Sequence, residues 1–305
     1  MSNVFRREFR SLFRSVAGWA TLILLAFGAG VLTTVNNFLS LSSDATRMFP
    51  ILCDALILLC PWLASHALTY DNAAGNTAWL RSLPLSRAEI VCGKYFAALS
   101  LFGIAAAYFA LFPLLIGTWG KVSYGSAYAA LLGWFLIAAA ALAVSCLIAS
   151  RTEKRWQAIL FGALACAGLY VLPLLASLIA AFPWVGIPVL TLVAAGAVLP
   201  AILRSVRSGK KVPLPARIIP AAVCGAAVAL FFIQRRFYTK VLPEVLDFLS
   251  VFSRLDGFRD GHFDVSGVAY LASVAAVCLV LMTVLPDRCR NGKGGMSHAK
   301  DIRTE

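Results

Sequence analysis

Charged residues are scarce in this sequence, and their scarcity decides its class. Asp, Glu, Lys and Arg make up 13% of the 305 residues, whereas 60% are hydrophobic, and the mean hydropathy is +0.83. A soluble domain carries roughly 25% charged residues. Apolar runs of about 20 residues recur along the chain, the length that crosses a bilayer as a helix. The sequence therefore predicts an all-α polytopic membrane protein and excludes a soluble domain.

Motifs for catalysis, nucleotide binding and metal binding are also missing. No G-x-x-x-x-G-K-[ST] phosphate loop occurs, because the run 209–211 (Gly-Lys-Lys) lacks the upstream glycine and follows no predicted strand. No H-E-x-x-H or G-x-S-x-G pattern occurs either. With three His and fourteen acidic residues, an intramembrane enzyme would have few reactive groups. We expect no catalytic, cofactor or metal site, and an energy source on another chain.

The eight cysteines form no C-x-x-C pair. Six of them fall inside apolar runs of spanning length: Cys53, Cys60, Cys146, Cys166, Cys224 and Cys278. In apolar helices a free cysteine acts as a small, soft hydrophobe. We expect neither a disulfide framework nor a cysteine metal site.

The net charge of +13 follows from membrane topology. If the N-terminus is cytoplasmic, 20 of the 27 Lys and Arg residues fall in inside segments, which are 1–18, 71–94, 151–155, 204–217 and 286–305. An excess of basic residues in cytoplasmic segments is the rule for such proteins. We expect both termini in the cytoplasm, a multi-pass protein of the cell (inner) membrane, and no nucleic-acid partner.

The predicted membrane domain covers residues 17–286. Eight stretches in it have spanning length: 19–38, 48–70, 96–119, 124–150, 156–181, 184–203, 218–234 and 265–285. The first lacks a small-residue cleavage site, which predicts a true span and no cleavable signal peptide. The region 183–235 is interpreted as an extra hairpin, or alternatively as one interfacial hairpin that never crosses. The glycine-rich tail, 287–305, is expected to be flexible.

Residues 1–16 form a predicted amphipathic helix. Its apolar positions are Phe5, Phe9, Leu12, Phe13 and Val16, and its basic positions are Arg6, Arg7, Arg10 and Arg14. A basic helix of this kind lies in the membrane interface with its arginines near anionic head groups. We assign Phe5, Phe9, Arg10, Phe13 and Arg14 as membrane-interface residues. The helix is either an anchor only or an elbow that borders a partner.

Two ionisable residues lie in the second span. An acid within a span is a functional candidate by default, but Asp54 lies only about two turns from the expected outer end. We interpret Asp54 as structural and His66 as an interfacial histidine.

The longest polar interruption in the first half of the chain runs from 71 to 95. Pro84 disfavours helix at the residue before it. Ser86 is a good N-cap, and Glu89 follows three residues later, as in a capping box. The pattern predicts a short helix between two spans that docks on something else.

This segment resembles the loop between the second and third spans of type-2 ABC transporter permeases, in the branch with gliding-motility and nitrous-oxide-reductase accessory permeases. The matching residues are Gly75, Leu80, Pro84, Ser86, Arg87, Glu89, Ile90, Val91, Gly93, Lys94 and Tyr95. Asn76 and Ala78 depart from the branch's Thr and acidic residue. A second stretch, 241–265, resembles the family's outer re-entrant segment, with Val251 in place of the usual Pro. Its predicted short helix has one apolar face: Val245, Leu249, Phe252 and Leu255.

The resemblance implies a permease subunit with a six-span core, two copies of a separate ATPase, and a second permease, either identical or related. Export is the family's usual direction. An extracytoplasmic partner is a further candidate. The residues implied in ATPase coupling are Leu83, Pro84, Leu85, Ser86, Arg87, Glu89, Gly93 and Lys94; alternatively, Arg87 only anchors the loop at lipid head groups.

Two other functions stay open at this point. One is a non-transporting scaffold or motility component driven by an ABC ATPase. The other is an ion-coupled carrier, which predicts inverted repeats and paired broken helices; the sequence displays neither clearly.

Overall fold

A computed structural model describes residues 2–40, 42, 44–73, 86–118, 120–152, 154–182, 242–259 and 265–284. Throughout these ranges the regular structure is helical, and no strand is present in them. The chain divides into two compact units: one contains residues 1–168 and 254–305, and the other contains 169–253.

Six described helices are long and apolar enough to cross a membrane: Val16–Leu39, Met48–Leu68, Ala88–Gly117, Tyr124–Ala149, Arg155–Ala181 and Val265–Val284. They coincide with six of the eight predicted spans, which confirms an all-α polytopic membrane protein. The two remaining predicted spans, 184–203 and 218–234, lie outside the described residues, together with the loop between them and the tail.

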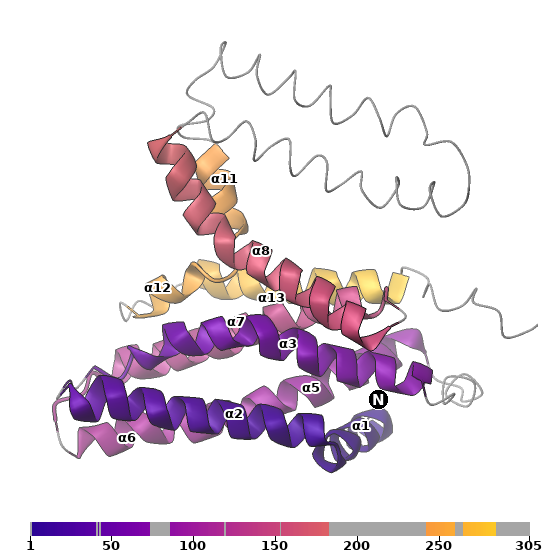
Figure 1. The fold of residues 1–305 in the computed structure, drawn as a ribbon, viewed down its shortest axis with the longest axis horizontal. Coiled ribbons are helices and arrows are strands. Elements are labelled where there is room, and N and C mark those ends of the chain that lie inside the picture. The colour runs from indigo at the N-terminus through magenta and orange to yellow at the C-terminus, as the bar shows by residue number, and fades with distance from the viewer. Residues whose placement is uncertain are drawn as a thin grey trace, which may run out of the picture. The chain divides into compact units, whose positions relative to one another are not determined.

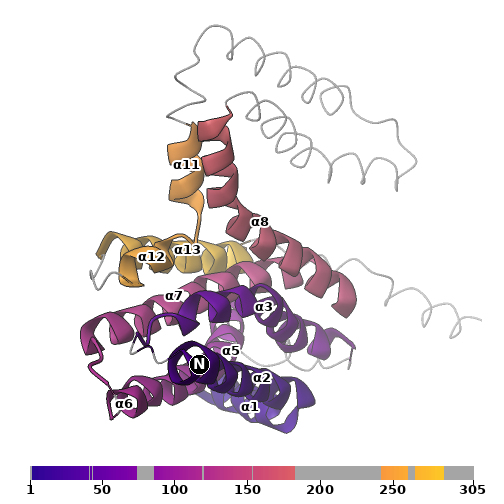
Figure 2. The same cartoon turned by 60° about the vertical axis from the view of Figure 1, so that its left-hand side comes forward.

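The larger unit is built around helix α7 (Tyr124–Ala149). This helix packs against α3 (Met48–Ala73), α5 (Arg87–Phe109), α12 (Arg254–Arg259) and α13 (Val265–Val284). Figures 1 and 2 show α3, α7 and α13 running in roughly the same direction. Three alanines of α7, at 138, 140 and 141, are fully buried. Small residues let membrane helices approach closely, so the alanine run explains the central place of α7.

An aromatic cluster fills the core between α5 and α7. The ring of Trp134 lies edge-on to Phe109 at 4.9 Å and to Phe102 at 6.3 Å, between ring centroids. On the other side, a Cβ atom added at Gly133 would come within 2.8 Å of the ring of Phe258. The missing side chain at 133 therefore makes the room in which α12 packs on α7.

Two prolines affect the shape and packing of these helices. Pro113 has no N–H to donate to the preceding turn, and the third span is correspondingly divided at Ala110 into α5 and α6 (Leu111–Gly117). Pro61 lies inside α3, where a Cβ atom on Gly162 would meet its ring at 2.9 Å. Helix α8 (Arg155–Ala181) therefore approaches α3 closely at this glycine.

Helix α2 (Val16–Thr33) ends in a π-helical segment, η1 (Thr34–Leu39). The turn before α3 is held by Asp44, which accepts hydrogen bonds from the N–H and hydroxyl of Thr46 at 3.0 and 2.7 Å and pairs with Arg47 at 3.4 Å. Partial burial disfavours the carboxylate, but the Thr46 and Arg47 contacts outweigh it and lower the pKa of Asp44.

The predicted single helix near residue 250 is wrong. The structure has two helices, α11 (Leu242–Leu249) and α12, separated by residues 250–253. The Ser250 hydroxyl accepts a hydrogen bond from the N–H of Ser253 at 3.2 Å, and donates to the Leu169 carbonyl at 3.5 Å. This local side-chain bonding competes with helix continuation. Consequently Val245 is exposed while Phe252 is buried.

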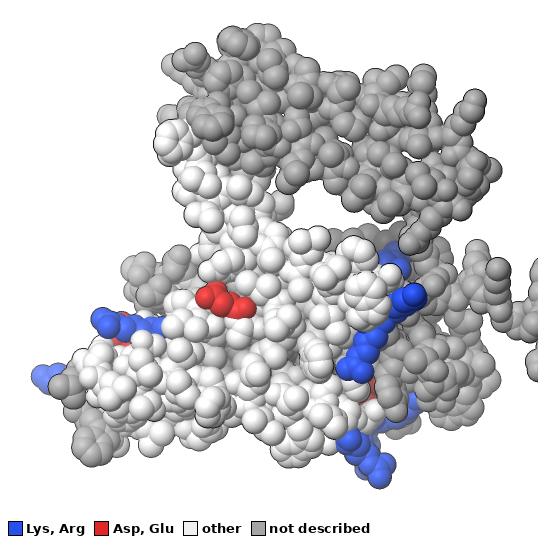
Figure 3. All heavy atoms as spheres, in the orientation of Figure 1, with Lys and Arg blue, Asp and Glu red and all other residues white. Residues whose placement is uncertain are grey.

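Basic side chains are unevenly spread over the face of the molecule drawn in Figure 3. Figure 3 shows Lys and Arg gathered at the two ends of the membrane helices, with a largely uncharged surface between them. Asp54 lies on α3 with an exposed side chain.

Candidate functional site

The described part of the predicted coupling segment begins at Ser86. Leu83, Pro84 and Leu85 lie outside the described residues, as does the side chain of Arg87. The Ser86 side chain accepts a hydrogen bond from the N–H of Glu89 at 3.3 Å, and the Glu89 carboxylate accepts one from the N–H of Ser86 at 3.1 Å. The capping box predicted from the sequence is confirmed.

The helix that follows differs from the prediction in length. Instead of a short separate helix, α5 runs without interruption from Arg87 to Phe109 through Gly93. Most residues of this stretch favour helix, and one glycine costs only about 1 kcal/mol. The capped end is therefore the first turn of the third span itself.

Three consecutive residues, Gly93, Lys94 and Tyr95, join α5 to three other helices. At Gly93, helix α1 (Ser2–Arg14) comes so close that an added Cβ atom would lie 2.8 Å from the side chain of Val4. The Tyr95 hydroxyl donates a hydrogen bond to the Ala139 carbonyl of α7 at 3.0 Å. The Gly-Lys-aromatic run of the sequence motif therefore has a clear packing role.

Lys94 is the best-connected residue of the predicted site. Its side chain is 8% exposed, and its Nζ donates a hydrogen bond to the Ala67 carbonyl of α3 at 2.9 Å. The same Nζ lies 3.9 Å from the Oε1 atom of Glu8 on α1. A buried ammonium is costly unless it is paired and hydrogen-bonded. Lys94 has both kinds of partner and so ties α1, α3 and α5 together.

Glu8 is the functional candidate that the sequence analysis missed. It is the one acidic residue among the first sixteen, and it is 8% exposed. It lies four residues after Val4 and four before Leu12, both buried, so these three share the face of α1 that packs on the bundle. A lone acid in line with two buried apolar residues was the signal that could have revealed it.

The predicted interface residues of α1 lie on its other faces. The rings of Phe5, Phe9 and Phe13 form a ladder that continues to Trp19 of α2, with successive centroids 5.8, 4.7 and 6.0 Å apart. The side chains of Arg10 and Arg14 are exposed. Aromatic rings beside arginines are typical of a helix at the membrane–water boundary.

The corner between α1 and α2 is tightly built. Ser15 caps α2 by accepting a hydrogen bond from the N–H of Gly18 at 3.3 Å, and its hydroxyl donates to the Leu12 carbonyl at 3.1 Å. The indole N–H of Trp19 donates to the Phe13 carbonyl at 2.8 Å. A Cβ atom on Gly18 would collide with the Leu12 carbonyl. These contacts fix the direction of α1 relative to the first span.

A comparison with known protein families identifies the family of this chain. Residues 19–207 match the family described as ABC-2 family transporter protein. The chain belongs to the ABC-2 transporter family. No curated protein and no solved structure gives a significant match.

The ABC-2 match confirms the resemblance at the level of the family. It makes the chain a permease subunit of an ABC transporter, a multi-pass membrane protein that works with an ABC ATPase. The matched range contains Ser86, Gly93 and Lys94, whereas Glu8 precedes it. The tie at Lys94 therefore joins the ABC-2 core to a helix outside the matched range.

Proposed function

We propose that this ABC-2 permease receives the motion of its ATPase through segment 71–95 and passes it to the membrane helices through α5. The observation that carries the proposal is the continuity of α5 from its capping box at Ser86 to Phe109. Because a hydrogen-bonded helix is stiff along its axis, a push on its first turn displaces the whole span. The resemblance of 71–95 to the family's coupling loop supports the same assignment.

The contacts of Gly93 and Lys94 support a shared movement of several helices. Lys94 is bonded to α3 and paired with α1, and Gly93 packs on α1. A displacement of α5, the third span, therefore acts on α3, the second span, and on the interfacial helix α1 as a group. We assign Ser86, Arg87 and Glu89 to the ATPase contact, and Gly93 and Lys94 to transmission within the permease.

We assign ATP hydrolysis to the separate ATPase subunit. The sequence has no phosphate-binding loop, so we propose that this chain is not an enzyme by itself and acts with two ATPase copies and a second permease. The direction proposed is export, and the branch proposed is that of the gliding-motility and nitrous-oxide-reductase accessory permeases. Both rest on the resemblance of residues 71–95 and 241–265.

The test is purification of the tagged permease from its own cells, followed by identification of the bound subunits. The wild type is expected to retain an ABC ATPase. Arg87→Glu reverses one charge in the proposed contact, and losing one member of an interfacial charge pair costs roughly 2–5 kcal/mol, so this variant is expected to insert normally and lose the ATPase. Lys121→Glu, in the loop at the far end of the third span, is the matched control.

Three results would count against the proposal. Retention of the ATPase and of full activity by Arg87→Glu would place the contact elsewhere and leave Arg87 as a head-group anchor. Equal loss in Lys121→Glu would show a general effect of charge reversal. Recovery of the ATPase with no transported substrate, but with an extracytoplasmic protein, would favour a mechanical scaffold in place of a transporter.

A further inference from the structure

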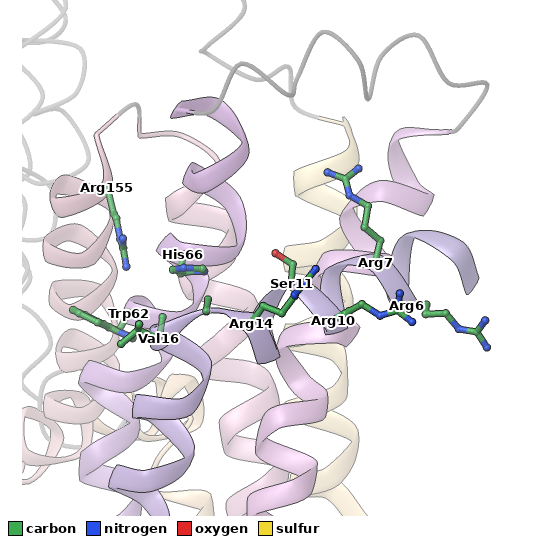
Figure 4. Close-up of a pocket in the computed structure, with 11 residues that line it drawn as sticks. Arg6, Arg7, Arg10, Ser11, Arg14, Val16, Trp62, His66 and Arg155 are labelled. Carbon is green, nitrogen blue, oxygen red and sulfur yellow. The ribbon is translucent and has the colours of Figure 1, made fainter.

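An open pocket of about 900 Å³ lies where α1 meets the ends of three spans. Among the described residues, five arginines line it, four from α1 and Arg155 from the first turn of α8, and α3 contributes Trp62 and His66. No Asp or Glu is among these described lining residues. Figure 4 shows Arg155, Trp62 and His66 on one side of the pocket and the arginines of α1 on the other.

Three of the arginines that line this pocket have no paired carboxylate among the described residues. Arg6, Arg10 and Arg14 form no ion pair with any carboxylate of the described residues. The guanidinium of Arg155 lies over the Trp62 ring at 5.5 Å from its centroid, a cation–π contact that leaves its charge in place. Like charges that line one cavity repel one another, so an anion in the pocket would reduce the repulsion.

The pocket is at the boundary of the membrane-spanning helices. Val16, in its lining, begins the first span, Arg155 begins the fifth, and His66 is near the end of the second. The aromatic ladder from Phe5 to Trp19 lies on α1 and α2, which also contribute residues to the pocket lining. Aromatic rings mark the depth of lipid head groups.

An apolar surface continues from the pocket along the spans. Val16 is 85% exposed, and Trp156 and Leu160 on α8 are also well exposed. A free inorganic anion would use only the arginines, whereas a phospholipid would also cover this apolar flank with its acyl chains. The combination of a cationic cavity with an adjoining exposed apolar surface favours the lipid.

We propose that the pocket binds one anionic phospholipid, whose phosphate is attracted by the arginines of the lining, Arg14 and Arg155 among them (Figure 4), with Trp62 beside the glycerol. Arginine suits this role because its planar fork gives bidentate, charge-assisted hydrogen bonds to phosphate. The bound lipid joins α1 to α3 and α8, on the opposite side of α1 from the Lys94 tie. This site is independent of the proposed ATPase contact.

The experiment is native mass spectrometry of the purified full chain, titrated with phosphatidylglycerol or with phosphatidylcholine of the same acyl chains. The wild type is expected to bind one phosphatidylglycerol tightly and phosphatidylcholine weakly. Each removed arginine near an anionic lipid weakens binding by about five-fold, so Arg14→Gln should show that loss. Arg14→Gln with Arg155→Gln should lose roughly 25-fold.

Lys154→Gln is the matched control, because Lys154 immediately precedes Arg155, is exposed and does not line the pocket. It should bind phosphatidylglycerol like the wild type. If the double variant fails to fold, the proposed lipid site is tested by two other measurements, the lipid preference of the wild type and the titration of Arg14→Gln. Millimolar inorganic phosphate should leave the lipid complex intact.

Four results would overturn the proposal: equal affinity of the wild type for both lipids, unchanged affinity in Arg14→Gln, an equal loss in Lys154→Gln, or displacement of the lipid by inorganic phosphate. The last would identify a free phosphate site. Unchanged lipid binding together with loss of ATPase co-purification in the double variant would assign the arginines to a protein contact.

Discussion

Replacing Lys94 by methionine is expected to destabilise this permease more than any change of an exposed lysine. The side chain of Lys94 is 8% exposed, and its ammonium serves both the Ala67 carbonyl and the Glu8 carboxylate. Methionine is nearly as long and fills a similar volume, so the change removes the charge and the hydrogen bond with little change in packing. It also removes the cation that lies 3.9 Å from the buried Glu8 carboxylate.

The size of the effect follows from this burial. Removing one partner of a buried ion pair costs about 3–5 kcal/mol, and Glu8 can reduce the cost by binding a proton, so we expect about 3 kcal/mol. For a domain of this size, 1 kcal/mol shifts Tm by about 2–4 °C. The expected fall in Tm is therefore about 6–12 °C. Glu8→Gln combined with Lys94→Met should cost less than the sum of the single changes, by about 1–2 kcal/mol.

The buried cysteines provide the assay. Cys53, Cys60, Cys146 and Cys166 are buried, so a dye that becomes fluorescent on reaction with thiols reports unfolding of the detergent-solubilised protein as it is heated. Lys121→Met, at an exposed position, is the control and should stay within about 0.5 kcal/mol of the wild type. One refuting result is a Tm of Lys94→Met equal to that of the Lys121→Met control. Another is a loss of stability in the double variant equal to the sum of the losses in Lys94→Met and Glu8→Gln. Either result would refute the assignment of Lys94 as the residue that joins α1, α3 and α5.

Three further expectations concern single positions. Ser86→Ala removes the N-cap of α5 and should lower the stability of its first turn by about 1 kcal/mol. Amide hydrogen exchange should become faster in this turn but not in α7, and unchanged exchange in the first turn of α5 would contradict the role of the cap. Asp54→Asn should leave expression, melting and activity largely intact, since Asp54 is exposed on α3; loss of activity at normal expression would make it functional. Asp44→Asn should lower stability at neutral pH by less than about 1 kcal/mol, because the pair with Arg47 is about half exposed. The folded-state pKa of Asp44 is lowered from 3.8, so its contribution is full above that pH and is lost as the pH falls below it, and the melting curves of variant and wild type should converge in acid.

The helical spans could be predicted from the sequence because the length of an apolar run is enough to identify a span. Six of the predicted spans agree with described helices to within a few residues at most ends. The capping box at Ser86 and Glu89 was equally readable, because it depends on residues only three apart. The continuity of α5 through Gly93 was missed, since a glycine after a polar stretch also fits a helix end.

The contacts between distant segments could not be predicted. Glu8 and Lys94 are 86 positions apart, and nothing in either local pattern specifies that α1 crosses α5 at Gly93. The break at Ser250 was missed for a related reason: its hydroxyl bonds the Leu169 carbonyl, 81 residues earlier. The amphipathic pattern of residues 1–16 predicted the helix, but it did not distinguish the packing face from the arginine face that lines the pocket.

Site-specific cross-linking tests the central claim most directly. Ser86 is exposed at the start of α5, and Ser123 is exposed before α7, at the far end of the third span. In a cysteine-free chain, Ser86→Cys should cross-link to the co-expressed ATPase through a short bifunctional thiol reagent, and Ser123→Cys should not. A cross-link from position 123 alone, or from neither position in a complex that still contains the ATPase, would contradict the account.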